Sequence, residues 1–507
     1  MTPLRVRDYA LAALLALAAA ALYAVLGVHA GYTGTISDAA VYLVIADHFS
    51  PWRTTVPDLG PFAFARYPFP PLYPLLLAWA GGGSSAPFAS HAFGAATLGA
   101  AVGAAYAWLR ANGAPAIAAL ALTLLFALLP VTLVTALDIV SEPLYLLLSL
   151  VGLVAIAGPA TARRGLVAAL AIGLAAVART AGVTLLAAFV LAWLPRARGA
   201  LRLWPPLLAC APAVVWSIVK HVYGLGTYDV DAGGPARLIA TMGGNLRALA
   251  EGLVTSFDLT APSHVALSLA GLAVPAAIGW FGALRRRECA AWYAAFHLAL
   301  LLVWPHPAHA RRFLFVLLPF ALGYVWSGAV RLAGERGTWG GTAVVVLVGL
   351  LGLPGGSLVL GQIASGEPER RTPMWYRIAD PAAATRAVQT TTRMLRFVHA
   401  AGSSLPADAC ISAALPQYVL LHAHRRTEIL PLPAAGAQAL DAALARCPYV
   451  MMMAVEDHPP SGLPPMYPFA WIKNRMKVLG VEYLHPGSGE GTVLAMLARV
   501  ERVAAGD

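Results

Sequence analysis

Three carboxylic acids stand next to long apolar runs, where acid–base chemistry could occur. Asp38 begins an amphipathic stretch, and Asp138 and Glu142 lie four residues apart between two apolar runs. A general base must lie within hydrogen-bond reach of the proton that it removes, and a carboxylate can fill that role. Each acid also has a structural interpretation, because Asp is a favoured N-cap and an acid suits the first turn of a helix. We take all three as candidate catalytic residues, with Asp38 as the leading one.

Several basic residues near apolar runs could bind an anion. Arg66 and Tyr67 precede the proline-rich run from Pro68 to Pro74, and Lys220 ends an apolar run. The planar fork of Arg makes paired, charge-assisted hydrogen bonds to phosphate. The alternative is an interfacial anchor, in which an aromatic ring and a snorkelling charge hold a helix end. The candidate phosphate-binding residues are Arg66, Tyr67, Lys220, Arg311 and Arg312.

Cofactor signals are weak in this sequence. His306 and His309 share one loop, and two histidines alone do not define a metal site. No Cys-x-x-Cys spacing and no glycine loop of the nucleotide-binding type is present. We therefore assign no metal ligand and no certain cofactor, and keep a divalent metal ion as an alternative.

The elements that position these residues are predicted to be membrane helices. Of 507 residues, 59% are hydrophobic and 12% are charged, against about a quarter charged in soluble proteins. A helix needs about 20 apolar residues to cross a membrane. Eleven stretches approach that length, and we interpret the first as an uncleaved helix. They are residues 9–28, 86–109, 116–137, 141–158, 165–178, 180–195, 203–220, 264–284, 289–304, 313–330 and 341–363.

The distribution of arginine predicts the orientation. The net charge of +11 does not indicate nucleic-acid binding, because the basic residues fall singly or in short clusters between apolar runs. Alternate connections are rich in arginine and, by the positive-inside rule, face the cytoplasm together with the N-terminus. Separately from orientation, the frequent use of Arg and Ala is typical of the codon usage of a GC-rich bacterial genome. The 13 cytoplasmic arginines are Arg5, Arg7, Arg110, Arg163, Arg164, Arg196, Arg198, Arg202, Arg285, Arg286, Arg287, Arg331 and Arg336.

Three long features then lie outside the cytoplasm. A membrane domain, residues 1–363, carries outer loops at 29–71 and 221–263, and residues 364–507 form an extracytoplasmic, periplasmic domain. In the first loop, Tyr42, Ile45, Ala46 and Phe49 fall on one helical face that could lie on the membrane. A short apolar segment, residues 72–80, is expected to dip into the interface.

The tail has the pattern of a small α/β domain. Asp380-Pro381 is a helix start, and strand-like runs occur at 409–415, 428–432, 449–455, 481–484 and 493–497. Cys410 opens one of these runs and Cys447 precedes another. The starts of neighbouring parallel strands lie about 4.8 Å apart, which is within disulfide reach. We predict a Cys410–Cys447 disulfide, and the alternative is two buried free thiols.

Several segments together resemble the integral membrane glycosyltransferases of the GT-C fold, the protein mannosyltransferase and lipid A aminoarabinose transferase group. The resemblance covers about residues 1–330. Members of the group carry an Asp-Glu pair in the first loop, whereas Ala39 follows Asp38 here, so a second acid would come from Asp138 or Glu142. The matching segments are Ser37–Tyr42 with Ala46, Tyr67–Pro74, Ser141–Leu144, Gly173–Thr180, and Arg311–Leu314 with Pro319.

The resemblance implies an inverting hexosyl- or pentosyltransferase. Its donor would be a polyprenyl-phosphate sugar, and its acceptor a lipid, a glycan or a protein. The reaction would take place on the outer face of the bacterial inner membrane, with the lipid chain between helices. Asp38 would act as the base, and Arg66, Lys220, Arg311 and Arg312 would hold the lipid phosphate.

Two other functions fit the same composition. A transporter or flippase of a lipid-linked anion would also place charges in the membrane, although such proteins often show two related halves and no repeat is visible here. A non-catalytic assembly or receptor protein would use the tail as its binding domain. A single cavity that holds the acids and bases favours the enzyme, and scattered positions favour the others.

Overall fold

The computed structural model divides the protein into two compact units. The first consists of Met1–His29, Phe64–Leu76 and Phe88–Glu367, and the second of Ala30–Ala63, Leu77–Pro87 and Pro368–Asp507. The loop after the first helix therefore folds together with the C-terminal tail. The structure describes residues 4–30, 37–53, 69–223, 235–257, 262–304, 310–378, 380–413, 415–430, 436–453, 476–483 and 493–500.

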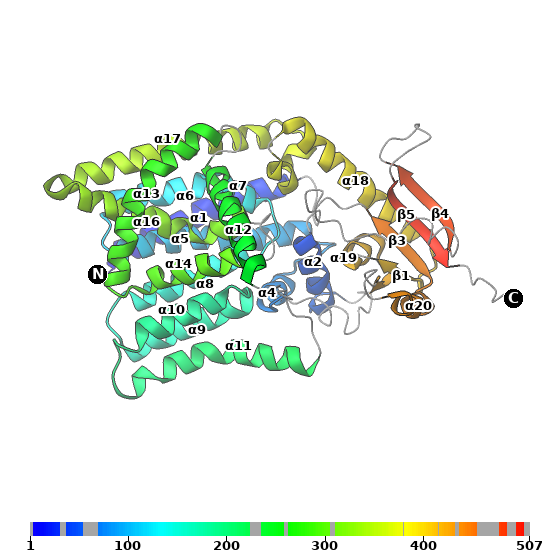
Figure 1. Ribbon diagram of the computed structural model, residues 1–507, viewed down its shortest axis with the longest axis horizontal. Coiled ribbons are helices and arrows are strands. Elements are labelled where there is room, and N and C mark those ends of the chain that lie inside the picture. The colour runs from blue at the N-terminus through cyan, green and yellow to red at the C-terminus, as the bar shows by residue number, and fades with distance from the viewer. Residues whose placement is uncertain are drawn as a thin grey trace. The chain divides into compact units, whose positions relative to one another are not determined.

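The first unit is helical (Figure 1). Each of the eleven predicted stretches falls in one or more of its helices, because long apolar runs favour helices in a membrane protein, and α11, α13 and α17 each continue through an internal proline. The helices are α1 (Val6–Val28), α5 (Pro87–Ala111), α6 (Ala116–Leu128), α7 (Pro130–Ala136), α8 (Glu142–Ile156), α9 (Ala162–Ala178), α10 (Gly182–Trp193), α11 (Trp204–Val222), α12 (Pro235–Phe257), α13 (Pro262–Arg285), α14 (Cys289–Leu302), α15 (Ala310–Leu314), α16 (Leu318–Leu332) and α17 (Gly337–Ala364). Helix α4 (Leu72–Trp79) lies in the predicted interfacial segment.

Within the described residues, five helical segments are long and apolar enough to cross a membrane, or six if the bent pair α6–α7 counts as one. The bend of 58° between α6 and α7 has a local cause. Pro130 begins α7 and lacks an N–H, and it holds Leu129 in the extended conformation. Several other apolar helices are shorter, so a count of eleven crossings remains a prediction.

Helix α12 lies in the segment that the sequence predicts as an outer loop. The Asn245 side chain, which is 3% exposed, donates hydrogen bonds to the carbonyls of Leu302 (2.9 Å) and Trp304 (2.7 Å). Carbonyls at a helix end have no partner within their own helix, so α12 caps the end of α14. The helix also packs against α15, which carries two of the candidate arginines.

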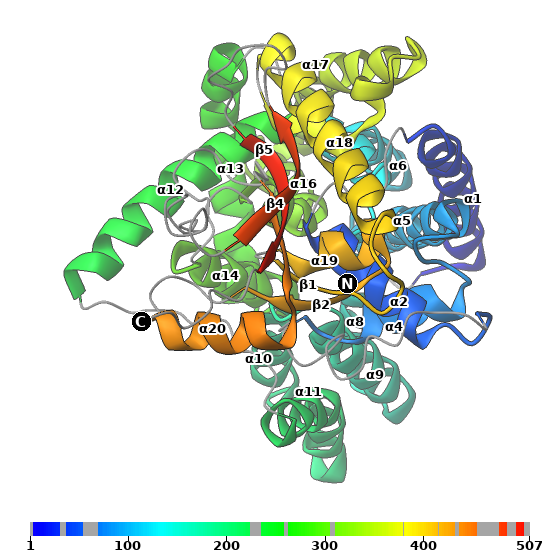
Figure 2. The same cartoon turned by 90° about the vertical axis from the view of Figure 1, so that its right-hand side faces the viewer.

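The second unit contains a five-stranded sheet (Figure 2) in the order β2-β1-β3-β5-β4. Strand β1 runs parallel to β2 and β3, and β5 runs antiparallel to β3 and β4. All five predicted strands form, and the Asp380 carboxylate caps the following helix through the N–H groups of Ala382 and Ala383. The strands are β1 (Cys410–Ala413), β2 (Arg426–Ile429), β3 (Tyr449–Met453), β4 (Met476–Tyr483) and β5 (Val493–Val500), and the longer helices are α18 (Pro381–Ser403) and α20 (Gly436–Arg446).

Helix α2 (Ser37–Phe49) also belongs to the second unit. It packs against α19 (Pro416–Tyr418) and the π-helix η7 (Val419–Ala423) of the same unit. Residues 39–46 are all buried, with Tyr42 and Ile45 each 2% exposed. The prediction that one apolar face of this helix lies on the membrane is therefore wrong. Its sequence is apolar on every face between the two aspartates, which is typical of a helix enclosed by protein.

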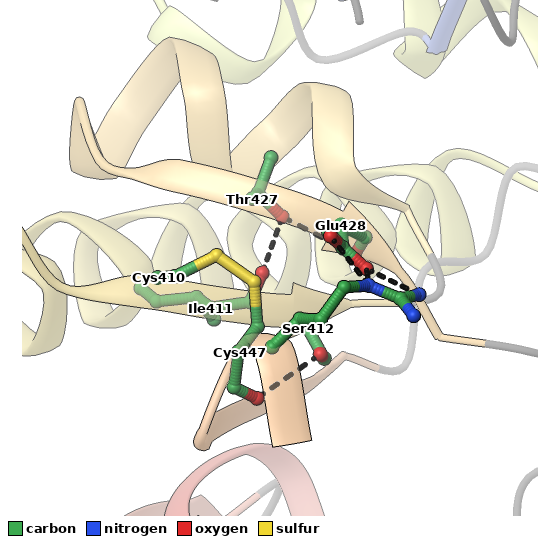
Figure 3. The surroundings of a disulfide bond; sticks show 7 residues. Cys410, Ile411, Ser412, Thr427, Glu428 and Cys447 are labelled. Carbon is green, nitrogen blue, oxygen red and sulfur yellow. Dashed lines mark hydrogen bonds and ion pairs between the residues drawn. A yellow bond between two sulfur atoms is a disulfide. The ribbon is translucent and has the colours of Figure 1, made fainter. Parts of the chain in front are cut away.

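A disulfide joins Cys410 to Cys447 (Figure 3), as the sequence predicts. Their Cα atoms lie 4.7 Å apart. The physical reason is the parallel pairing of β1 and β3, which places Ile411 opposite Tyr449 and so brings the two strand starts together. The Ser412 hydroxyl also donates to the Cys447 carbonyl at 3.3 Å. The remaining two cysteines, Cys210 and Cys289, are free.

Candidate active site

A buried carboxylate paired with two arginines lies in the first unit. Glu142 begins α8 after the Ser141 N-cap and is 1% exposed. An acid in the first turn interacts favourably with the helix dipole, and the Pro143 that follows suits a helix start. Arg179 ends α9 in an extended conformation (φ −147°, ψ 142°), which lets the chain turn into α10. Arg312 comes from the short helix α15.

Both guanidinium groups contact the same carboxylate. Arg179 Nη1 lies 2.8 Å from Glu142 Oε1, and Arg312 Nη2 donates to Glu142 Oε2 at 3.2 Å. Arg312 Nε also forms an ion pair with Glu142 Oε1. The arginine side chains are 15% and 13% exposed. We call these three residues the Glu142 cluster.

Neighbouring groups fix the positions of both arginines. Arg179 Nη1 donates to Ser141 Oγ at 3.1 Å, and its guanidinium lies 5.3 Å from the centre of the Phe313 ring. Phe313 in turn packs edge-to-face with Trp304 at 5.9 Å. The His297 ring nitrogen Nε2 lies 3.4 Å from the Phe313 carbonyl. The cluster is therefore held by side chains from α8, α9, α14 and the segment around α15.

The charges of the Glu142 cluster do not cancel. One carboxylate and two guanidinium groups leave a net positive charge among apolar helices. A charged residue in such surroundings is expensive and usually marks a functional site. Two arginines have ten N–H donors between them, more than one carboxylate can accept. The arrangement is suited to bind an additional anion, and a phosphate group would fit the geometry of the guanidinium forks.

Comparisons with known proteins bear on the fold. No family model matches the chain, and no curated protein matches its sequence. Among solved structures, ArnT from Cupriavidus metallidurans bound to undecaprenyl phosphate matches with a TM-score of 0.52 and 12% identity, over 98% of this chain and 99% of that chain. The apo ArnT structure gives 0.53 and 13%, over 96% and 97%. The chain has the GT-C fold. The fold that the sequence motifs predict is confirmed.

The structure brings together only some of the candidate residues of this GT-C chain. Glu142 and Arg312, predicted separately as an acid and a phosphate ligand, contact one another. Arg311 is the neighbouring residue on α15. Helix α12 packs closely against it, because a β-carbon added to Gly252 would lie only 2.8 Å from the backbone nitrogen of Arg311. Lys220 is half-buried in the last turn of α11.

The other candidates belong to other elements of the chain. Asp138 follows α7, and its carboxylate accepts a hydrogen bond from the Ile139 N–H at 2.9 Å, as a turn residue does. Asp38 lies in the first turn of α2, in the second unit, and is half-buried. Arg66 and Tyr67 fall outside the described residues.

Two residues that the sequence analysis did not single out have defined contacts. Arg179 stands alone between two apolar runs, at the end of a helix whose other end carries Arg163 and Arg164. Its isolation and its place in the matching segment Gly173–Thr180 were the available signals. In the second unit, the Asp47 carboxylate of α2 accepts hydrogen bonds from the Ser84 N–H at 3.0 and 3.1 Å and pairs with Arg53. Asp47 thereby ties α2 to the turn at residues 82–84.

A metal site does not emerge from the described part of the GT-C chain. Among those residues, no group of three or more His, Cys, Asp or Glu side chains could hold an ion. His306 and His309 lie outside the described residues, so the weak metal signal in their loop is not tested.

Proposed function

We propose that the protein is a membrane glycosyltransferase that uses a polyprenyl-phosphate sugar as its donor. The observation that carries the proposal is the Glu142 cluster, in which two arginines from distant segments converge on one buried acid in a chain with the GT-C fold. The match to ArnT bound to undecaprenyl phosphate supports a lipid-linked donor. We further propose a lipid, glycan or protein acceptor and a reaction on the outer face of the bacterial inner membrane.

In the proposed reaction, the arginines act on the leaving group. The acceptor hydroxyl attacks the anomeric carbon, the bond from that carbon to the phosphate oxygen breaks, and the lipid phosphate leaves with both electrons. Negative charge grows on the phosphate in the transition state, where preorganised cations stabilise it most effectively. Arg312 and Arg179 supply those cations. Each guanidinium carries five N–H donors, so phosphate oxygens can share Arg179 and Arg312 with the Glu142 carboxylate.

Glu142 has a different role in this proposal from the one that its sequence suggests. A carboxylate in contact with two guanidinium groups is poorly placed to remove a proton from an acceptor. We propose that Glu142 is a positioning residue, which orients Arg179 and Arg312 and partly neutralises them when no donor is bound. Buried charges of one sign would otherwise repel each other and disfavour the arrangement.

The base and the other donor contacts are proposed from the sequence. Asp38 is our candidate general base, which takes the proton of the acceptor hydroxyl, and Asp138 is the alternative acid. Lys220, Arg66 and Tyr67 remain proposed contacts of the donor phosphate. Of the adjacent pair Arg311 and Arg312, both candidates from the sequence, we propose Arg312 as the phosphate ligand. Direct displacement with one base would invert the configuration at the anomeric carbon.

The test compares envelope molecules by mass spectrometry from cells that lack the gene, that express it, and that express Arg312→Ala. We expect one glycolipid, glycan or glycoprotein to lose the mass of one sugar residue in the first and third strains. Identical envelopes in all three strains would contradict the proposal. Full restoration by Arg312→Ala would remove the Glu142 cluster from the mechanism.

A further inference from the structure

A cavity in the first unit lies at the other end of α14 from the Glu142 cluster. It has a volume of about 450 Å³, and its polar lining comes from Asn112, Arg286, Glu288, Trp326, Ser327 and Arg331. Glu288 is the N-cap of α14, whereas the contacts of His297 and Trp304 with Phe313 lie toward the C-terminal end of that helix. Since α14 has 14 residues, its ends are about 20 Å apart. The cavity is therefore a separate site.

The charges that line this cavity leave one arginine in excess. Arg286 Nε donates to Glu288 Oε1 at 2.7 Å, so these two residues largely neutralise each other. The exposed side chain of Arg331, in the last turn of α16, makes no hydrogen bond or ion pair with any residue that the structure describes. The cavity therefore presents a guanidinium group that a ligand can pair with, and its net charge is positive.

A glycine on the neighbouring helix makes room for this guanidinium. Helices α13 and α16 pack closely, and a β-carbon at Gly282 would overlap Arg331 Nη1. The Arg331 side chain therefore lies across the surface of α13. Its position depends on the absence of a side chain at residue 282.

The remaining lining is suited to the interface between water and lipid. The Trp326 ring and the Val330 side chain line the cavity beside Arg331, and the next residue, Leu332, is 57% exposed. Tryptophan is enriched where a membrane meets water, because its ring is apolar and its N–H is polar. The Asn112 amide donates one N–H to the Trp108 carbonyl at 2.8 Å and keeps a second N–H for a headgroup. The Ser327 hydroxyl donates to the Tyr324 carbonyl at 3.1 Å, so its oxygen can accept a hydrogen bond from a headgroup hydroxyl. The ligand that fits has an anionic head and an apolar body.

We propose that this cavity binds the headgroup of an anionic phospholipid of the phosphatidylglycerol type, with Arg331 as the main phosphate ligand. Basic pockets between membrane helices bind such headgroups. A zwitterionic lipid would bring a cation into a cavity that is already positive, and the one carboxylate present is paired with Arg286. The proposal does not depend on the proposed function, because none of these residues belongs to the Glu142 cluster.

The experiment uses the full-length protein, stripped of lipid in detergent and titrated with dioleoylphosphatidylglycerol while the bound complexes are counted by native mass spectrometry. Dioleoylphosphatidylcholine and inorganic phosphate serve as comparison ligands. The variants are Arg331→Ala and Gly282→Ala. Gly282→Ala keeps every charge, but its methyl group occupies the space of the Arg331 guanidinium. The matched control is Arg285→Ala. Arg285 is an exposed arginine next to Arg286 in sequence, and it does not line the cavity.

We expect the first phosphatidylglycerol to bind at least tenfold more tightly than phosphatidylcholine. Arg331→Ala and Gly282→Ala should each weaken that binding about tenfold, and Arg285→Ala should change it less than twofold. Equal binding of the two lipids would overturn the proposal, as would equal losses from Arg331→Ala and Arg285→Ala. Displacement of the lipid by millimolar inorganic phosphate would assign the cavity to a free anion instead. A melting temperature for each unliganded variant shows whether it is folded.

Discussion

Arg311 and Arg312 are identical in type and adjacent in sequence, yet the structure gives them different surroundings. Side chains of consecutive helical residues point about 100° apart. Arg312 contacts Glu142, and Arg311 lies where α12 packs against α15. A comparison of the two arginine variants therefore tests whether a contact with Glu142 is needed for phosphate binding.

We predict that Arg312→Ala lowers sugar transfer at least tenfold, which is about 1.4 kcal/mol in the barrier. Arg311→Ala should lower it less than threefold. The physical reason is that only Arg312 belongs to the cluster that would hold the leaving phosphate. Transfer is measured with purified protein and a polyprenyl-phosphate sugar, followed by mass spectrometry of the product. Equal, small effects from both variants would mean that the two arginines are only interfacial anchors.

Removal of the acid from the Glu142 cluster should destabilise the first unit. Glu142→Ala leaves two mostly buried guanidinium groups without their carboxylate, and breaking a buried ion pair typically costs about 3–5 kcal/mol. The loss is expected as a lower melting temperature in detergent. Asp138→Ala, which removes an acid from a nearby turn, is the control and should have a smaller effect. If Arg312→Ala is added to Glu142→Ala, part of the lost stability should return.

The prediction for Asp38 concerns the rate of sugar transfer and not the stability of the fold. Asp38→Asn should abolish sugar transfer while the protein still folds and inserts, because an amide cannot accept the proton of the acceptor hydroxyl. Asp47→Asn is a useful comparison, since Asp47 holds the turn at residues 82–84 and its loss should lower stability first. A folded Asp38→Asn protein with transfer reduced less than tenfold would make Asp38 only a helix-capping residue.

At the level of elements, the sheet of the second unit depends on a covalent link between two of its strands. Cys410 and Cys447 are 37 residues apart in sequence. In the chain-entropy model, closing a loop of that length stabilises the folded state by roughly 3–4 kcal/mol. The link lies at the point where β1 begins and the chain enters β3, so it also fixes the register of their parallel pairing.

We predict that Cys410→Ala combined with Cys447→Ala lowers the stability of the second unit by about 3–4 kcal/mol. Thiol labelling of the unreduced, denatured wild-type protein should modify two cysteines, Cys210 and Cys289, and labelling after reduction should modify four. Four reactive thiols without reduction would show that the bridge is absent in the cell. A cytoplasmic location of the tail would also be harder to exclude in that case.

The helices of the first unit show how packing acts on an apolar run. The stretch 116–137 is continuous in hydrophobicity, but Pro130 divides it into two helices that differ in direction by 58°. The segment 221–263 contains α12, whose Asn245 caps α14 by binding its terminal carbonyls. Neither arrangement is visible in hydrophobicity, because one depends on a single proline and the other on a contact between distant residues.

For the whole molecule, the arginine distribution gives a topology that can be measured. A reporter that is active only outside the cytoplasm should be active when fused after Asp507. It should be silent when fused after Arg164 or Arg286. The reason is that arginine-rich connections stay in the cytoplasm during insertion. The opposite pattern would contradict both the orientation and a reaction on the outer face.

Local sequence was enough to predict most of the helices and strands, although α12 lies in the segment 221–263, which was expected to be a loop. Three signals are local: the length of the apolar runs, the Asp380-Pro381 helix start, and the short strand-like runs in the tail. Each acts within a few residues, so each could be interpreted without the fold. The Cys410–Cys447 bridge could also be predicted, because parallel pairing follows from the order of strands and helices in a small α/β domain.

The folded structure was needed to show which charges meet. Arg312 and Glu142 are 170 residues apart, and Arg179 was not recognised as their partner until the helices were in place. Helix α2 was predicted to lie on the membrane with its apolar face, yet protein buries residues 39–46. The physical reason is the same in both cases. Local sequence fixes how a chain coils, whereas the partner of a buried charge or an apolar face depends on contacts between segments that are distant in sequence.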